Sequence, residues 1–87
     1  MNDKDLFQRG LDFQEMVNSP GWTILKREIE QDLQNLHNQL PTLVLSDRIA
    51  DAKRAAAKIE AFDSILSKVE QALIDKKEAA ENLEKER

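Results

Sequence analysis

Residues 46–87 read SDRIADAKRAAAKIEAFDSILSKVEQALIDKKEAAENLEKER and contain neither glycine nor proline. Apolar side chains recur along this stretch in alternating steps of three and four residues, with one polar interruption at Lys76. Such spacing is the heptad pattern of a helix that packs lengthwise against another helix. It predicts a long helix over about residues 47–85, with Ser46 as its N-cap. The apolar seam consists of Ala52, Ala55, Ile59, Phe62, Leu66, Val69, Leu73, Ala80 and Leu83.

Proline marks both ends of a second predicted helix. Ser19 precedes Pro20, and a hydroxyl N-cap followed by proline at the first helical position is a common helix start. Pro41 disfavours helical geometry at the residue before it, which predicts that this helix ends near residue 39. A short amphipathic stretch lies upstream. The expected elements are therefore three helices, over about residues 3–18, 20–39 and 47–85.

The composition favours the same fold class. Of the 87 residues, 40% are hydrophobic, 34% are charged and only 5% are aromatic, with two glycines and two prolines. Residues that favour helices dominate, whereas the β-branched and aromatic residues typical of sheets are sparse. This length fits one domain. We therefore expect a single all-α domain over residues 1–87, with a short N-terminal helix and an antiparallel hairpin whose second helix is long and coiled-coil-like.

The two longer predicted helices differ in length, which leaves part of the seam uncovered. At about 1.5 Å per residue, the long helix reaches about 60 Å and the middle helix about 30 Å. The hairpin therefore covers the seam only to about residue 66. Either the N-terminal helix folds back over the remainder or another copy of the chain covers it, and we expect self-association. The candidate oligomer interface is Ile59, Phe62, Leu66, Val69, Leu73 and Leu83.

Two other features are candidates for contact with a partner. Leu43, Val44 and Leu45 are three consecutive apolar residues in a predicted connection, where polar residues are usual. They either cap the end of the bundle or form an exposed contact patch. Trp22 lies at the start of the middle helix and is either a core residue or a binding anchor. The candidate partner contacts are therefore Trp22 and residues 43–45.

Lys76 is the polar residue within the seam, and two interpretations are open. A polar residue at such a position can fix the register or the oligomeric state at some loss of stability. Alternatively, the segment from Lys76 to Arg87, which is rich in lysine and glutamate, is solvated and frayed.

The sequence predicts no catalytic, cofactor-binding or metal-binding residue. There is no cysteine, which excludes disulfides and thiolate metal sites. His37 is the only histidine, and no carboxylate lies four residues from it. The chain also lacks a glycine-rich phosphate loop and a set of serine, histidine and aspartate residues that could form a triad. We therefore expect a noncatalytic protein that needs no cofactor.

The charge balance bears on partners and location. The chain has 13 basic and 17 acidic residues, a net charge of -4, which disfavours nucleic-acid binding. A nucleic-acid-processing accessory or small DNA-binding subunit is still the alternative function, because Lys53, Arg54 and Lys58 form a basic run. Acidic residues flank that run. No stretch is long and apolar enough for a membrane span, and the acidic start is unlike a signal peptide, so we expect a cytoplasmic protein.

The residues SPGW at positions 19–22, followed by Leu25 and Ile29, carry a family resemblance. This opening resembles that of small helical proteins of unassigned role encoded by tailed bacteriophages, in which a Pro-Gly-Trp start leads into an amphipathic helix and then a longer one. The resemblance covers about the first half of the chain. It implies an accessory or assembly protein in the host cytoplasm, with a phage or host protein as its partner, and it assigns no functional residue.

Overall fold

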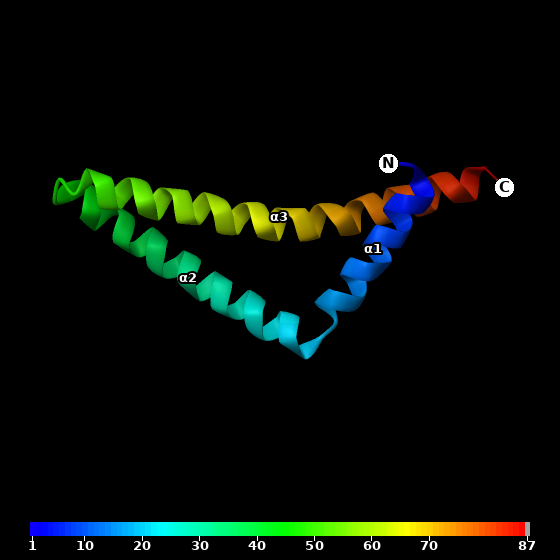
Figure 1. Ribbon diagram of the computed structural model, residues 1–87, viewed down its shortest axis with the longest axis horizontal. Coiled ribbons are helices and arrows are strands. Elements are labelled where there is room, and N and C mark those ends of the chain that lie inside the picture. Colours follow the sequence, from blue (N-terminus) through cyan, green and yellow to red (C-terminus); the bar gives the residue numbers. More distant parts are fainter. Residues whose placement is uncertain (87) are drawn as a thin grey trace. The chain divides into compact units, whose positions relative to one another are not determined.

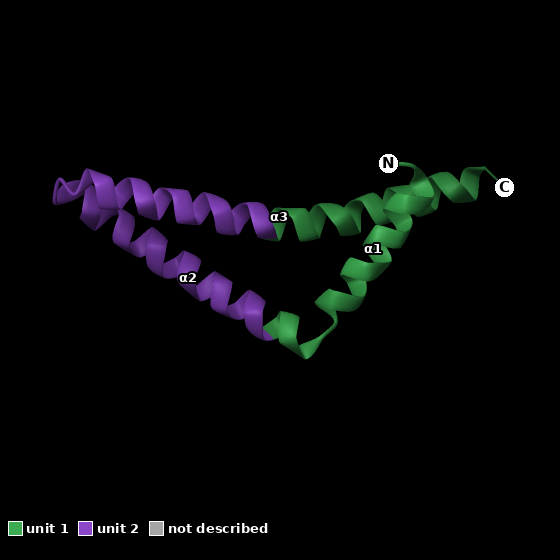
Figure 2. Cartoon of the chain, in the orientation of Figure 1, with its two compact units in different colours: residues 1–23, 66–87 green, residues 24–65 purple. Residues whose placement is uncertain are grey.

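The computed structural model describes residues 1–86, which form three α-helices and, within that range, no strand (Figure 1). The helices are α1 (Asp3–Val17), α2 (Pro20–Leu45) and α3 (Ile49–Lys85). The expected all-α fold is confirmed. The chain divides into two compact units (Figure 2): unit 1 joins residues 1–23 with the part of α3 from Leu66 onward, and unit 2 comprises residues 24–65. The single domain expected over the chain stays a prediction.

Side-chain caps define the start of α1 and of α2. The backbone N–H of Asp5 donates to Oδ1 of Asn2 at 2.9 Å, which caps α1. The hydroxyl of Ser19 accepts from the backbone N–H of Trp22 at 3.2 Å and donates to the carbonyl of Met16 at 2.6 Å. One hydroxyl therefore ends α1 and begins α2. The predicted helix start at Ser19 and Pro20 is confirmed.

The predicted end of the middle helix near residue 39 is wrong, because α2 continues through Pro41 to Leu45. Proline removes one helical hydrogen bond, the one to the carbonyl of His37. Both Pro41 and His37 are exposed, so water can bind the freed carbonyl on the solvent side of the helix. The apolar stripe meanwhile continues past the proline to Leu43, which is half-buried. Packing of that stripe sustains the helix beyond Pro41.

A tight turn over residues 46–48 joins α2 to α3. The predicted N-cap of α3 at Ser46 is therefore wrong, because α3 begins at Ile49. The backbone N–H of Asp47 donates to the carbonyl of Val44 at 3.1 Å. The backbone N–H of Arg48 donates to the carbonyl of Leu43 at 2.9 Å. These two bonds form the Schellman motif that closes many helices. Asp47 has a φ of 58°, the left-handed conformation that this motif requires. Ser46 thus caps the end of α2, and α3 begins three residues later.

Unit 2 is the predicted antiparallel hairpin (Figure 2). It comprises α2 from Ile24 onward and α3 as far as Ile65, and the two helices lie closest near the turn that joins them. Ala52 and Ala55 are buried near the turn, and Ile29 is the buried residue of α2, farther from the turn. Burial of Ile29 stabilises the fold by about 2 kcal/mol. Half-buried residues extend this core along both helices: Leu33, Leu36, Leu40, Leu43, Ile59 and Phe62.

In unit 1, α1 packs along α3 from Leu66 onward. The contact is centred on small residues, because Gly10 of α1 is buried and Ala72 and Ala79 of α3 are each only 1% exposed. These two alanines lie one position before Leu73 and Ala80 of the predicted seam. The line of closest contact is therefore rotated by one residue from the prediction. The remaining contact residues are half-buried, and on α1 they are Leu6, Phe7, Phe13, Met16 and Val17.

Within residues 1–86, no helix combines the length and the apolar character needed to cross a membrane.

Candidate functional site

A groove of about 620 Å³ lies in unit 2, between the last turns of α2 and the first turns of α3. Its apolar lining comes from residues that also face the hairpin core. The walls differ in character, with uncharged polar side chains on α2 and mostly cationic ones on α3. The lining residues are Leu36, Asn38, Gln39, Thr42, Leu43, Arg48, Asp51, Arg54, Ala55 and Lys58.

The α2 wall of the groove belongs to an uncharged segment. Residues 33–46 contain no aspartate, glutamate, lysine or arginine, although 34% of the chain is charged. Amide and hydroxyl groups of this wall can donate and accept hydrogen bonds without any net charge. The electrostatic character of the groove is therefore set by α3 alone.

The α3 wall carries three cations and one carboxylate, a net charge of +2. Asp51 contacts two of the cations: its Oδ2 lies 2.6 Å from Nη2 of Arg48, and its Oδ1 lies 3.7 Å from Nη1 of Arg54. Nε of Arg48 also donates to Oδ2 of Asp51 at 2.9 Å. Lys58 is not in an ion pair within the described residues. Because these pairs are exposed, they orient the arginines more than they stabilise the fold.

Exposed apolar side chains lie at the same end of the hairpin. In the last turn of α2, Val44 is 53% exposed and Leu45 is 88% exposed, and Ile49 is exposed at the start of α3. We call these three residues the tip, and we call residues 33–58, which contain the groove and the tip, the closed half of the hairpin. The closed half thus combines an apolar tip with a cationic groove.

The candidate partner contacts fall in different places. Leu43 is half-buried and lines the groove, whereas Val44 and Leu45 are exposed in the tip. These three residues were predicted to lie in a connection between helices. They lie in helix instead, because α2 continues past Pro41 to Leu45. Trp22 is half-buried near the start of α2 and belongs to unit 1. It is not part of the closed half.

The candidate oligomer interface has intrachain neighbours along its length. Ile59 and Phe62 are half-buried in the hairpin of unit 2. In unit 1, Val69 is buried, and the remaining members, Leu66, Leu73 and Leu83, are half-buried where α1 packs on α3. The seam beyond the hairpin therefore has α1 as an intrachain partner, one of the two arrangements that the sequence left open. The role of these six residues between copies of the chain stays a prediction.

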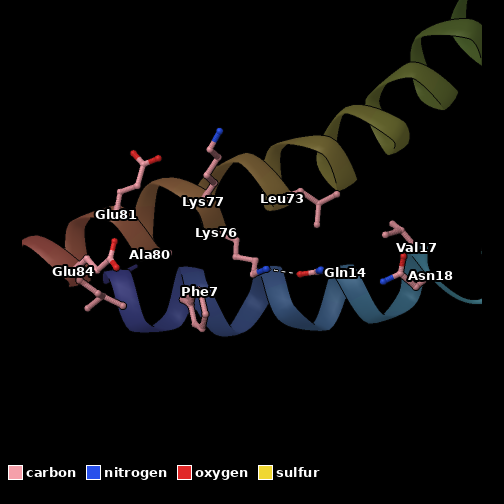
Figure 3. A pocket seen from close by; sticks show the side chains of 11 residues that line it. Phe7, Gln14, Val17, Asn18, Leu73, Lys76, Lys77, Ala80, Glu81 and Glu84 are labelled. Atoms are coloured by element: carbon pink, nitrogen blue, oxygen red, sulfur yellow. Dashed lines mark hydrogen bonds between the residues drawn. The ribbon is translucent and has the colours of Figure 1, made fainter.

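A second groove, of about 860 Å³, lies in unit 1 between α1 and α3 (Figure 3). Lys76 spans it: Nζ donates to Oε1 of Gln14 and lies 5.7 Å from the centroid of the Phe7 ring. Lys76 is thus a packed polar residue, and α3 continues as helix to Lys85, while the solvated and frayed end stays a prediction. The formal charges in the lining of this groove balance, since it contains two lysines and two glutamates.

The sequence interpretation did not identify the groove of the closed half. It noted the basic run at residues 53–58 but weighed that run only against neighbours on the same helix. The available signal was the absence of charge over residues 33–46. When the uncharged end of α2 lies opposite the basic start of α3 in a hairpin, the groove between them has one cationic wall.

Within residues 1–86, no cluster of three or more histidine, aspartate or glutamate side chains could hold a metal ion. Comparison with known proteins gives no match to this chain among family models, curated proteins or solved structures.

Proposed function

We propose that this chain is a noncatalytic helical protein that acts by self-association, with the closed half of the hairpin as the surface through which its copies meet. The observation that carries the proposal is the last turn of α2, which leaves Leu45 88% exposed in ordered helix. Neither Leu45 nor Val44 contributes to the core. Apolar side chains grouped beside a groove are typical of a contact surface.

The chemistry of the closed half supports binding. Two of its exposed cations, Arg48 and Arg54, pair with the half-buried Asp51. Exposed charges of this kind contribute little to folding stability, but they select and orient a partner of opposite charge. A surface that joins apolar and charged parts in this way suits recognition of another protein chain.

The resemblance of residues 19–29 to small phage-encoded helical proteins suggests the biological setting in which the copies of this chain assemble. On that basis, we propose an accessory or assembly role in the host cytoplasm, with a phage or host protein as the larger partner. The self-association does not depend on this assignment, and it can be tested with the purified chain alone.

Sedimentation equilibrium over a wide concentration range tests the proposal. We expect the mass to exceed that of one chain and to rise with concentration. A variant with Val44→Asp and Leu45→Asp associates at least about tenfold more weakly, because the contact would have to bury two charges. Ile24→Asp is the matched control, since Ile24 is 57% exposed and lies outside the closed half. The mass of one chain at every concentration would contradict the proposal.

A nucleic-acid-processing accessory, or small DNA-binding subunit, is the second candidate, and the cationic wall of the groove is the observation that favours it. The carboxylate of Asp51 within that wall and the net charge of -4 weigh against it. Binding to a DNA duplex at low and moderate salt separates the two functions. A DNA-binding protein loses affinity steeply as salt rises, because binding releases counterions from the phosphates.

A further inference from the structure

We infer that the groove of the closed half binds an acidic face of α3 that belongs to a second copy of the chain. The inference rests on the proposed self-association, and it names the two surfaces that meet. One is the groove described above. The other is a row of exposed residues on the part of α3 that lies in unit 1, which we call the acidic stripe: Glu70, Ile74, Glu78 and Glu81.

The acidic stripe runs along one face of α3. Its members are spaced by four, four and three residues, so their side chains project in similar directions. Ile74 is 50% exposed and is the one large exposed apolar residue on this part of α3. Glu81 is also among the residues that line the groove of unit 1, and Figure 3 shows its carboxylate directed away from α1. The stripe therefore presents one apolar side chain flanked by three carboxylates.

The stripe and the groove complement each other in charge. The groove carries a net charge of +2 on its α3 wall, and its remaining lining is apolar or uncharged. The three carboxylates of the stripe, with neighbouring Lys77 included, give a net charge of -2. Ile74 is suited to the apolar lining at Leu43, while the carboxylates on either side of it pair with the cations. Such an arrangement fixes the orientation of the docked helix.

The two surfaces also match in length. From Arg48 to Lys58 the cationic wall extends ten residues, or about 15 Å of helix. From Glu70 to Glu81 the stripe extends eleven residues, or about 16 Å. A docked stripe can therefore place carboxylates opposite the cations along the whole groove.

The contact has to form between two chains. The stripe and the cationic wall are both carried by α3, and a helix cannot dock onto itself. Each chain has one groove and one stripe, so the interface joins unlike surfaces. Such surfaces can join copies into closed rings or open chains, and two copies related by a twofold axis can also pair groove with stripe reciprocally in a closed dimer.

The lining of the groove favours a protein occupant over a nucleic acid. Leu36 and Leu43 are half-buried and offer an apolar surface that a phosphate backbone cannot use, and Asp51 would repel phosphates. An apolar residue with flanking carboxylates satisfies both parts of the lining. The chain itself provides that combination at Ile74.

Two charge-reversed chains test the contact by sedimentation equilibrium. The groove variant carries Arg54→Glu and Lys58→Glu, and the stripe variant carries Glu78→Lys and Glu81→Lys. Each has a matched control with the same change in net charge at exposed residues of α2 outside both surfaces. The controls are Lys26→Glu with Arg27→Glu, and Glu28→Lys with Glu30→Lys. Circular dichroism checks that every variant is as helical as the parent chain.

We expect the parent chain to form a dimer or a larger species and each surface variant to associate more than about tenfold more weakly. An equimolar mixture of the two variants regains association, because the intact groove of one accepts the intact stripe of the other. Both controls associate like the parent. This pattern, and in particular recovery in the mixture, requires that groove and stripe meet.

Other outcomes overturn the inference in distinguishable ways. If the parent associates and both surface variants associate equally well, the groove and the stripe are not the contact, and the proposed self-association stands. If only the groove variant is weakened, the groove binds another surface of the second copy. If the parent is a single chain at every concentration, the inference and the proposed self-association both fail. Binding of that single chain to a DNA duplex through Arg54 and Lys58 would then assign the groove to nucleic acid.

Discussion

Gly10 of α1 packs against the side chain of Lys76 of α3, so closely that no other residue fits at position 10. A Cβ on residue 10 would lie 2.7 Å from Cγ of Lys76 and closer still to its Cβ. The glycine allows α1 to approach the lysine stem, and the amino group then reaches Gln14 and the Phe7 ring. Lys76 thus buries its aliphatic part and keeps its charge at the edge of the contact.

We predict that Gly10→Ala destabilises the fold by about 1–3 kcal/mol, because the added methyl group forces α1 away from α3. The sign of the stability change distinguishes the two cases, because replacing glycine with alanine inside an exposed helix usually stabilises by about 1 kcal/mol. Gly21→Ala is the control: a Cβ there has no atom within 4 Å, so this variant is as stable as the parent or more so. Urea unfolding followed by circular dichroism measures both. An increase in stability for Gly10→Ala would refute the close packing.

We predict that the two functions of the Lys76 side chain separate on substitution. Lys76→Met keeps the aliphatic stem and loses the hydrogen bond to Gln14, which changes the stability by about 1 kcal/mol or less. Lys76→Ala also loses the packing against Gly10 and Phe7, and it destabilises by about 1–2 kcal/mol. Lys77→Ala, at an exposed neighbour, is the control and stays within about 0.5 kcal/mol. Equal stability of all three variants would place Lys76 in solvent.

Asp47 offers a stabilising substitution. Its left-handed conformation disfavours residues with a Cβ by about 1–2 kcal/mol, less for aspartate and asparagine. We therefore expect Asp47→Gly to raise the free energy of unfolding by about 0.5–1 kcal/mol. Ser46→Gly, at the adjacent residue, lacks this strain and does not stabilise. Thermal unfolding of both variants distinguishes them, and a loss of stability in Asp47→Gly would argue against the Schellman turn.

Pro41→Ala tests the continuation of α2 past the proline. Alanine restores the hydrogen bond to the carbonyl of His37 and favours helix, which stabilises by up to about 3 kcal/mol. The added freedom of the unfolded chain offsets about 0.4–1 kcal/mol of that gain. The expected result is a net stabilisation of about 1–2 kcal/mol, seen in urea unfolding. No gain would mean that the helix ends before residue 41.

The sequence predicted correctly those features that depend on neighbouring residues. The start of α2 follows from Ser19 and Pro20, whose hydroxyl and ring act within one helical turn. The end of α2 was missed for the opposite reason, because tertiary packing of Leu43 overrides the local preference at Pro41. A rule about one residue cannot weigh the contacts that a helix makes elsewhere.

The small residues at the α1 contact were missed for a related reason. A heptad assignment selects apolar residues by their spacing, and it placed Leu73 and Ala80 in the seam. The approach of Gly10 instead selects Ala72 and Ala79, which allow the helices to come close. The groove was missed because the uncharged segment over residues 33–46 and the basic run on α3 define it only when they are considered opposite each other across the hairpin.

The contacts in the two units join residues with very different separations along the sequence. The hairpin of unit 2 closes through a turn of three residues, whereas the hydrogen bond from Lys76 to Gln14 in unit 1 joins residues 62 positions apart. The entropy lost in closing a loop increases with loop length, so nearby contacts form first. We therefore expect the hairpin to fold early and α1 to dock late. We also expect the amide protons of α1 to exchange with solvent through a local opening that leaves the hairpin folded, which native-state hydrogen exchange would measure.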